Sequence, residues 1–408
     1  MSLYIGIDWS EQKHDIAYVN EAGGVIQRQT VAHSEEGFSQ FHQMCQRLSD
    51  GGEECILGLE TAHSLFVDYL WEQGYHALYV LPPNVVNKSR DRHRQSAAKN
   101  DELDAYVIAD LLRTDRHRLQ CWHPGSELLQ QMRISVRFHG RLTKQITQQS
   151  HRLRSILLRY YPAAYHLFPS WPTLAACRFL VQYPTPTAAL ALTSADFKAF
   201  LRQAGHPHRR AWLKYFRRLR ASYPVAAPAI AQAYPREATW LAQSLLEAMQ
   251  TKQDNLAHLT GLFDLHPDAY IFRSLPGAGP YLAPALLVKF GEDRRRFPTA
   301  AAVQALAGTC PVTIQSGQRR SVRFRRACDR EFRQIAQHYA RASLRHTEWT
   351  NTFYQSTLSR HPSKSRALRC LANRWLNILW TLWQREDCYD EARHLQNLVR
   401  YRPAPPLR

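Results

Sequence analysis

The pattern of hydrophobic and polar positions over the first 81 residues predicts a small sheet with helices. Short apolar runs typical of strands cover 3–8, 16–19, 25–29, 55–59 and 77–81. Turn residues 20–24 end in Gly-Gly, which supplies the positive φ that a hairpin needs, so the first three runs form an antiparallel meander. Segments 34–48 and 64–73 have helical spacing. The opening therefore predicts an α/β fold.

Apolar residues at helical spacing dominate the rest of the chain. They predict helices over 101–113, 128–160, 239–262 and 281–290, and further helices around Trp375 to Trp383. The 128–160 helix carries seven basic residues among its leucines and isoleucines, which indicates a basic strut or coiled-coil arm. The domains expected from these changes of character are 1–125, 126–262, 263–388 and a tail over 389–408.

Charge points to an anionic partner. The 408 residues contain 53 Lys and Arg against 34 Asp and Glu, a formal net charge of +19. Because 45% of the residues are hydrophobic, this charge belongs to a folded protein, and nucleic acid is the first expectation. The eight cysteines form no CxxC pair, which disfavours zinc fingers and a disulfide framework and fits a reducing cytoplasm. No apolar run reaches the roughly 18 residues of a membrane span.

Four carboxylates stand at positions from which they can meet. Asp8 ends the first predicted strand and Glu60 comes at the end of the fourth, while Asp101 and Asp104 share one face of a helix. Convergent carboxylates repel one another unless hard cations neutralise them, and Mg²⁺ prefers such oxygen ligands. Two ions about 3.5–4 Å apart are the usual arrangement in phosphodiester chemistry. For each acid alone, a helix-capping role is the more common explanation.

Two other segments are candidates for binding phosphates. The polar stretch 84–99 is expected to be a loop or frayed helix lying along phosphates, although a solvated face explains it equally well. Its basic residues are Lys88, Arg90, Arg92, Arg94 and Lys99. Gly277 and Gly279 precede a helix, where open amide N–H groups favour an anion, as in a helix-hairpin-helix grip on nucleic acid. A plain tight turn is the alternative there.

A serine in a basic segment is a candidate nucleophile. Ser316-Gly317 precedes a run of arginines, which can hold a scissile phosphate and stabilise the charge that develops on it. These candidate phosphate-binding residues are Arg319, Arg320, Arg323, Arg325 and Arg326. An isolated Ser-Gly is more often a turn, and Thr313 and Ser321 are rival hydroxyls.

Five motifs in one order resemble a known family. They are Gly6–Ser10, Leu59–Ala62, Lys99–Ala105, Leu275–Gly279, and Ala307-Gly308 followed by Gln315–Gly317. This order is similar to that of the DEDD transposases of the insertion-sequence 110 family, and the resemblance covers the first 125 residues and about 270–385. Only Ser316 among the three hydroxyls has the glycine that the motif requires.

The resemblance implies a RuvC-like, RNase H-fold domain over 1–125, a helical or coiled-coil region over 126–262 and a C-terminal transposase domain over 263–388. Family members are recombinases guided by a structured bridge RNA that pairs with donor and target DNA. Carried over by motif, Asp8, Glu60, Asp101 and Asp104 would bind Mg²⁺ or Mn²⁺, and Ser316 would form a covalent serine–DNA intermediate. The family works as an oligomer, and the long basic arm would be a dimerising strut. Residues 160–260 stay unassigned, with RNA binding and an oligomer interface both open.

Three alternatives remain. A metal-dependent nuclease or junction resolvase of the same fold would use water in place of Ser316 and leave free DNA ends. An actin-like sugar kinase is suggested by Ile5–Ser10, but the later glycine-rich nucleotide-binding turns are missing and the high positive charge is unusual for such an enzyme. A non-catalytic nucleic-acid-binding protein explains the charge and leaves the four ordered carboxylates unexplained.

Overall fold

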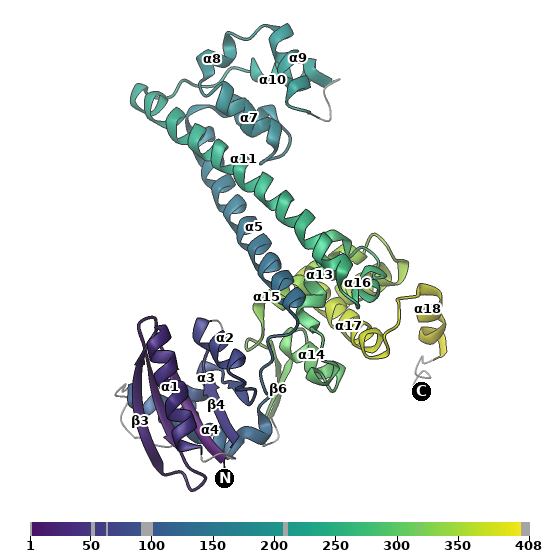
Figure 1. Cartoon of the computed structure of the whole chain (residues 1–408). Coiled ribbons are helices and arrows are strands. Elements are labelled where there is room, and N and C mark those ends of the chain that lie inside the picture. The colour runs from purple at the N-terminus through teal and green to yellow at the C-terminus, as the bar shows by residue number, and fades with distance from the viewer. Residues whose placement is uncertain are drawn as a thin grey trace. The chain divides into compact units, whose positions relative to one another are not determined.

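The structure is a computed structural model that describes residues 2–49, 54–62, 64–90, 101–206, 211–317 and 319–400, with side chains outside the description at 101–102 and 398–400. The chain divides into two compact units, 1–124 and 125–408, and each is described by itself. Figure 1 labels the elements of both.

A five-stranded mixed sheet forms the centre of the first unit. Its strands are β1 (Ser2–Trp9), β2 (Lys13–Val19), β3 (Val25–Ala32), β4 (Glu54–Leu59) and β5 (Leu78–Val80). They lie in the order β3-β2-β1-β4-β5, with the first three antiparallel and β1, β4 and β5 parallel. The five predicted strands are confirmed, and the sheet is RNase H-like.

Helices cover both faces of this sheet. On one face, β1 residues Leu3, Ile5 and Ile7 share a core with α1 (Glu35–Leu48) and α2 (Leu65–Glu72). On the other face, a second core joins the sheet to α3 (Pro83–Arg90) and α4 (Asp101–Asp115), which η1 (Arg116–Arg118) follows. Successive side chains along β1 and β4 point to opposite faces of the sheet, so alternate residues of each strand belong to the two different cores.

Gly6 sets how closely α4 approaches the sheet. A Cβ at this position would lie 1.9 Å from the Ala105 carbonyl oxygen and 2.6 Å from the Ala109 nitrogen, both backbone atoms of α4. Because backbone cannot rotate away as a side chain can, only glycine lets the first turns of α4 lie against β1.

Gly6→Ala is therefore expected to destabilise the first unit by about 1–3 kcal/mol, the usual cost of overpacking, and to shift α4 away from β1. Gly261→Ala is the control, because nothing lies within 4 Å of the added methyl in helix α11 (Pro228–Leu265), where alanine is the better helix former. Urea unfolding measures both variants, and equal stability of the two proteins would contradict this account of Gly6.

Two long helices lie side by side in the second unit (Figure 1). These are α5 (Glu127–Tyr160), close to its predicted bounds, and α11. Antiparallel pairing is fixed by the Gln149 amide donating to the Ser244 hydroxyl at 2.8 Å, and by Asn255 donating to the Ser135 carbonyl at 3.0 Å. The coiled-coil partner of the predicted arm is thus a helix of the same chain.

Helix α11 begins at Pro228, well before the predicted Thr239. A proline inside a helix removes one backbone hydrogen bond and usually ends the helix, which is why the sequence pattern stops short. Here Pro235 is accommodated within α11, where the Thr239 hydroxyl donates to its carbonyl at 2.8 Å.

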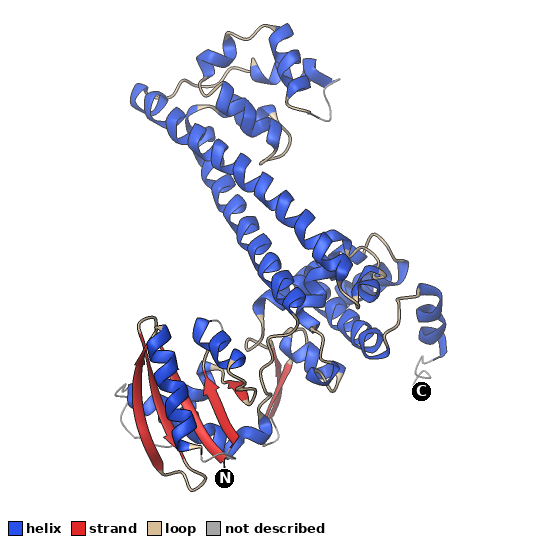
Figure 2. Cartoon of the chain, viewed as in Figure 1, coloured by secondary structure: helices blue, strands red, loops and turns tan. Residues whose placement is uncertain are grey.

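Five short helices form a separate core around one end of the α5 and α11 pair, called the tip region here (Figure 2). They are α6 (Pro162–Leu167), α7 (Leu174–Gln182), α8 (Pro186–Leu190), α9 (Ser194–Gln203) and α10 (Trp212–Leu219). Phe179 and Phe197 are fully buried in this core.

The other end of the helix pair joins the C-terminal core. Its helices are α12 (Ala269–Arg273), α13 (Gly279–Phe290), η3 (Arg294–Arg296), α14 (Ala300–Leu306), α15 (Arg330–Ser343), α16 (Glu348–Arg360), α17 (Lys364–Arg385) and α18 (Glu391–Arg400). Phe290, Trp375 and Trp383 are buried at its centre. Strands β6 (Val312–Ser316) and β7 (Arg319–Arg323) form an antiparallel hairpin. None of the described helices combines the length and apolar character that crossing a bilayer requires.

Candidate active-site elements

Asp8 and Glu60 come at equivalent places on neighbouring parallel strands. Ile7 of β1 is in register with Leu59 of β4, so the next positions along the two strands are Asp8 and Glu60. Strand alternation places both on the α4 face of the sheet, the face of Gly6 and Gly58. Since neighbouring strands lie about 4.8 Å apart, these two residues are neighbours at the carboxyl ends of β1 and β4.

Asp104 lies in the first turns of α4 and is only 7% exposed. The Arg90 guanidinium of α3 pairs with its carboxylate and also donates to the Asn87 amide oxygen at 2.7 Å. A carboxylate this buried requires a cationic partner, and Arg90 is that partner within the isolated chain. Asp101 begins α4 three residues earlier, but its side chain is outside the described part.

Asp15 is an acid that the sequence pattern missed. It lies on β2 directly opposite Asp8, on the same face of the sheet. The Thr30 hydroxyl donates to it at 2.5 Å and the Lys13 ammonium lies 3.3 Å away. The predicted strand begins at Ile16, which leaves Asp15 outside it. The polar positions Lys13 and Asp15, alternating with a buried His14, are the signal that the strand starts earlier.

The donor set suits a hard divalent cation, although the described side chains do not form a complete metal site. Among them no group of three or more His, Cys, Asp or Glu is close enough to hold an ion. Asp8 and Glu60 offer oxygen atoms on the face where α4 begins, and Asp104 already requires a positive partner. The residues present therefore fit Mg²⁺, with Asp101 as the candidate ligand that the description does not reach.

The basic segment before α4 is described only in part, up to residue 90. Residues 83–90 form α3, so the expected loop or frayed helix is a regular helix there. Lys88 is exposed on it and is available to phosphate. The guanidinium of Arg90, another residue predicted to bind nucleic acid, pairs with the Asp104 carboxylate. Arg92, Arg94 and Lys99 fall outside the described residues.

A buried histidine pair lies behind the acids, on the opposite face of the sheet. His14 is fully buried, stacks on Phe66 with ring centroids 4.8 Å apart, and its Nε2 lies 2.9 Å from Nδ1 of His33. Burial and the neighbouring His33 lower the pKa of His14 from 6.5 to about 4. His14 is therefore neutral in the folded protein at neutral pH.

The lowered pKa of His14 predicts that the first unit becomes less stable toward unfolding in acid. Between pH 6.5 and 4 the unfolded chain binds a proton at His14 that the folded chain does not, so stability is full above pH 6.5 and falls as the pH drops toward 4. From pH 7.5 to 5.0 the free energy of unfolding is expected to fall by on the order of 1 kcal/mol more in the wild type than in His14→Gln. Urea unfolding at the two pH values measures it, and identical pH dependence of both proteins would contradict the assignment.

Ser316 lies at the end of the β6 and β7 hairpin. Its partner across the hairpin is Arg319, and the intervening turn uses Gly317 at φ +55°, the left-handed conformation typical of two-residue hairpin turns. Alternation places Ser316, Ser321 and Arg319 on one face of the ribbon and Thr313 on the other. The two rival hydroxyls are thereby separated: Ser321 shares the face of Ser316, and Thr313 does not.

The arginines after Ser316 are largely exposed. Arg319, Arg320, Arg323 and Arg326 face solvent, and within the described residues none of them pairs with a carboxylate. Arg325 is half-buried, and its carbonyl accepts a hydrogen bond from the Arg333 guanidinium at 2.6 Å.

Cationic groups also lie close to the aromatic ring that follows the hairpin. The guanidinium carbons of Arg333 and Arg369 are 4.4 and 4.6 Å from the ring centre of Phe324. Arginines therefore lie along β7, beginning with Arg319 opposite Ser316, and two more lie at Phe324, just beyond the other end of the hairpin.

The two glycines before α13 have different surroundings. Gly277, at φ +78°, packs so tightly against the end of α15 that a Cβ would lie 2.5 Å from the His346 ring. Close packing therefore requires a glycine at this position. Gly279, at φ +59°, has nothing within 4 Å of the Cβ position, so its side of the turn is open to a ligand.

Comparison with known proteins agrees with the motif order. A family of transposases matches residues 5–162, and the transposase family IS116/IS110/IS902 matches residues 269–355. The chain is 30% identical to a mini-circle putative transposase for IS117 from Streptomyces coelicolor, over 98% of both chains. It is 27% identical to an uncharacterized 42 kDa protein of insertion element IS900 from Mycobacterium paratuberculosis, over 96% of this chain and 98% of the relative. The chain therefore belongs to the IS110 family of transposases, with a DEDD domain at its N-terminus and the family's second transposase domain toward its C-terminus.

Proposed function

We propose that this transposase is an RNA-guided DNA recombinase that cuts DNA through a covalent serine intermediate. The observation that carries the proposal is the combination of ordered acids on the α4 face of an RNase H-like sheet with a serine at the end of an arginine-rich hairpin. Neither feature alone requires recombination. Together they provide a hydroxyl nucleophile and the carboxylates that phosphodiester chemistry needs.

The four acids are proposed to hold one or two divalent ions at the scissile phosphate. Asp8 and Glu60 contribute oxygens from adjacent strands, and Asp101 and Asp104 contribute theirs from the start of α4. When bound, Mg²⁺ or Mn²⁺ neutralises the phosphate and stabilises the charge on the attacking and leaving oxygens. The ion pair with Arg90 orients the Asp104 carboxylate.

Ser316 is proposed as the nucleophile. Its Oγ attacks the phosphorus of one strand, a phosphoserine ester forms, and the bond to the leaving strand oxygen breaks with release of a free hydroxyl. A strand hydroxyl then attacks the phosphoserine and restores the serine, so atoms and bond energy are conserved over the exchange. The arginines of β7 stabilise the negative charge that develops on the phosphate.

Guide RNA and self-association complete the proposal. The net charge of +19 suits two nucleic acids bound at once, and base pairing with a structured RNA would provide the sequence recognition. The exposed hairpin includes Ile314 and Val322, which are 45% and 64% exposed. A two-stranded ribbon is marginally stable by itself, which favours a second copy or nucleic acid lying against it.

A direct test combines the full-length protein, Mg²⁺, the structured RNA from the flanking non-coding DNA, and labelled donor and target DNA. We expect joined donor–target strands only when all components are present, and no joined product when EDTA is added. Joined product that forms without RNA would overturn the guided mechanism.

A nuclease that uses water is the second candidate. It is favoured by one observation: within the described residues no side chain hydrogen-bonds to the Ser316 hydroxyl, so the isolated chain does not visibly activate it. Such an enzyme would leave free DNA ends and no protein adduct.

Binding to nucleic acid is expected to depend steeply on salt. Because many exposed arginines meet phosphates, raising the salt from 50 to 200 mM is expected to lower the affinity for RNA or DNA by about a thousandfold. Fluorescence anisotropy of labelled RNA and DNA measures this, and an affinity that stays level across the range would mean that the basic surface is not the interface.

A further inference from the structure

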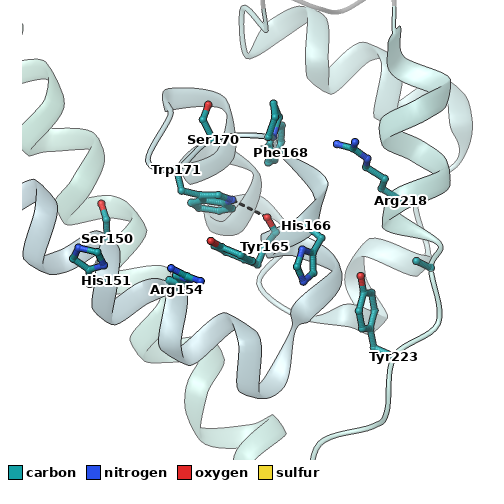
Figure 3. Close-up of a pocket in the computed structure, with 12 residues that line it drawn as sticks. Ser150, His151, Arg154, Tyr165, His166, Phe168, Ser170, Trp171, Arg218 and Tyr223 are labelled. Atoms are coloured by element: carbon teal, nitrogen blue, oxygen red, sulfur yellow. Dashed lines mark hydrogen bonds between the residues drawn. The ribbon is translucent and has the colours of Figure 1, made fainter. Parts of the chain in front are cut away.

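A pocket in the tip region stands apart from both candidate active-site elements. It has a volume of about 560 Å³ and lies among the α5 and α6 helices, the loop after α6, and the end of α10 with the linker that follows it (Figure 3). This volume is within the range of small-molecule sites in proteins, roughly 300–1,000 Å³. The short helices of the tip region create the pocket, so it belongs to the part of the chain that the motifs leave unassigned.

Flat aromatic rings form much of the pocket wall. The Tyr165 and Trp171 rings are nearly parallel, at 19°, with centroids 6.1 Å apart, and the Trp171 indole N–H donates to the Tyr165 carbonyl at 2.9 Å. His166 and Tyr223 form a second nearly parallel pair, at 9° and 5.9 Å. Figure 3 shows these rings gathered around one space. Such surfaces suit a flat ligand that binds by stacking.

The charge around the pocket is entirely positive. Arg154 of α5 and Arg218 of α10 line it, and none of the residues that line it is acidic. The Arg154 guanidinium also lies 5.5 Å from the Tyr165 ring centre, and within the described residues neither arginine pairs with a carboxylate. Two guanidinium groups without carboxylate partners favour a ligand that carries a phosphate.

Aromatic faces with an arginine on either side match the chemistry of a nucleotide within a strand (Figure 3). We propose that this pocket binds an unpaired nucleotide of a single-stranded nucleic acid, with the base stacked on the aromatic rings and the phosphates on its two sides met by Arg154 and by Arg218. A base within a duplex cannot enter, because both of its faces are covered by neighbouring base pairs. The tip region would thereby anchor a loop or a free end of the nucleic acid that the transposase handles. The inference rests on the proposed function only in taking nucleic acid as the ligand.

The test is photo-cross-linking of the full-length protein to short single strands that contain one thio-substituted pyrimidine. RNA and DNA of the same sequence are compared, each alone and annealed to its complement, and cross-linked peptides are mapped by mass spectrometry. We expect cross-links to Tyr165, Trp171 or Tyr223 with single strands and little with duplexes. Stronger cross-linking of RNA would identify a guide as the source of the nucleotide, and stronger cross-linking of DNA would identify a displaced strand.

Two variants and a matched control make the test specific. Arg218→Gln removes one guanidinium without emptying the core, and Tyr223→Ala removes one stacking surface; each is expected to lower the cross-link yield about tenfold. Arg202→Gln changes an exposed arginine of α9 outside the pocket and is expected to leave the yield unchanged. Circular dichroism checks that all three variants are folded.

The pocket assignment is overturned if cross-links map only outside the tip region, if duplexes cross-link as well as single strands, or if Arg218→Gln and Arg202→Gln behave alike. The readout needs no DNA cleavage. A protein that cross-links in the tip region but fails to recombine DNA would therefore contradict the proposed function and leave the pocket assignment standing. A protein that recombines DNA but does not cross-link in the tip region would contradict the pocket assignment and leave the proposed function standing.

Discussion

Asp104→Asn is expected to abolish DNA strand cleavage, with a rate at least about a thousandfold below wild type, while RNA binding survives. The physical reason is that the amide keeps the shape of the carboxylate and removes the negative charge that a divalent ion needs. Losing several kcal/mol of stabilisation of transition-state charge corresponds to at least this factor. A gel assay of labelled DNA with Mg²⁺ measures cleavage, and anisotropy measures RNA binding.

Asp110→Asn is a close control for this experiment. Asp110 lies on the same helix as Asp104, is 5% exposed, and pairs with Arg113 as Asp104 pairs with Arg90. Both substitutions therefore disturb a buried ion pair of α4, but only one removes a proposed metal ligand. Full activity in Asp104→Asn, or equal losses in the two variants, would refute the metal role of Asp104.

Ser316→Ala is expected to eliminate the covalent protein–DNA adduct completely, because no Oγ remains to form the ester. Denaturing electrophoresis of the protein with Mg²⁺, RNA and labelled junction DNA detects the adduct as label that migrates with protein. Metal binding and the fold are expected to be unchanged, since Ser316 is exposed at the end of the hairpin.

The hairpin offers two controls for the nucleophile. Ser321→Ala changes a hydroxyl on the same face of the ribbon, and Thr313→Ala changes one on the opposite face. Both are expected to retain the adduct. If the adduct persists in Ser316→Ala and disappears in Ser321→Ala, the nucleophile has been assigned to the wrong serine; free ends in every variant would favour the nuclease.

The strands that deliver Asp8 and Glu60 could be predicted because their apolar runs are short and bounded by turns. Their side-by-side position then followed from strand order, and the register of Ile7 with Leu59 agrees with it. The Arg90 and Asp104 pair could not be predicted, since two residues on separate helices meet only through the packing of α3 on α4. From the sequence Arg90 is one of several basic residues before α4, and only the structure shows that it pairs with Asp104.

The tip region shows a different limit. Helix α11 continues through Pro235, and short helices begin at Pro162 and Pro186, where the proline ring suits the first turn. The pocket draws on three separate stretches of sequence, 150–154, 165–171 and 218–223. No local pattern connects such residues, so only the three-dimensional packing reveals that its aromatic and cationic side chains face one space.

The most direct test of RNA guidance is to change only the RNA. Two guide RNAs that differ in their target-pairing loop are each mixed with the wild-type protein, Mg²⁺, donor DNA and an equal mixture of the two matching targets, and the joined products are sequenced. We expect each RNA to direct joining to its own target, with no product in its absence. The same product distribution with either RNA would show that the protein selects its DNA by other means and would contradict the account.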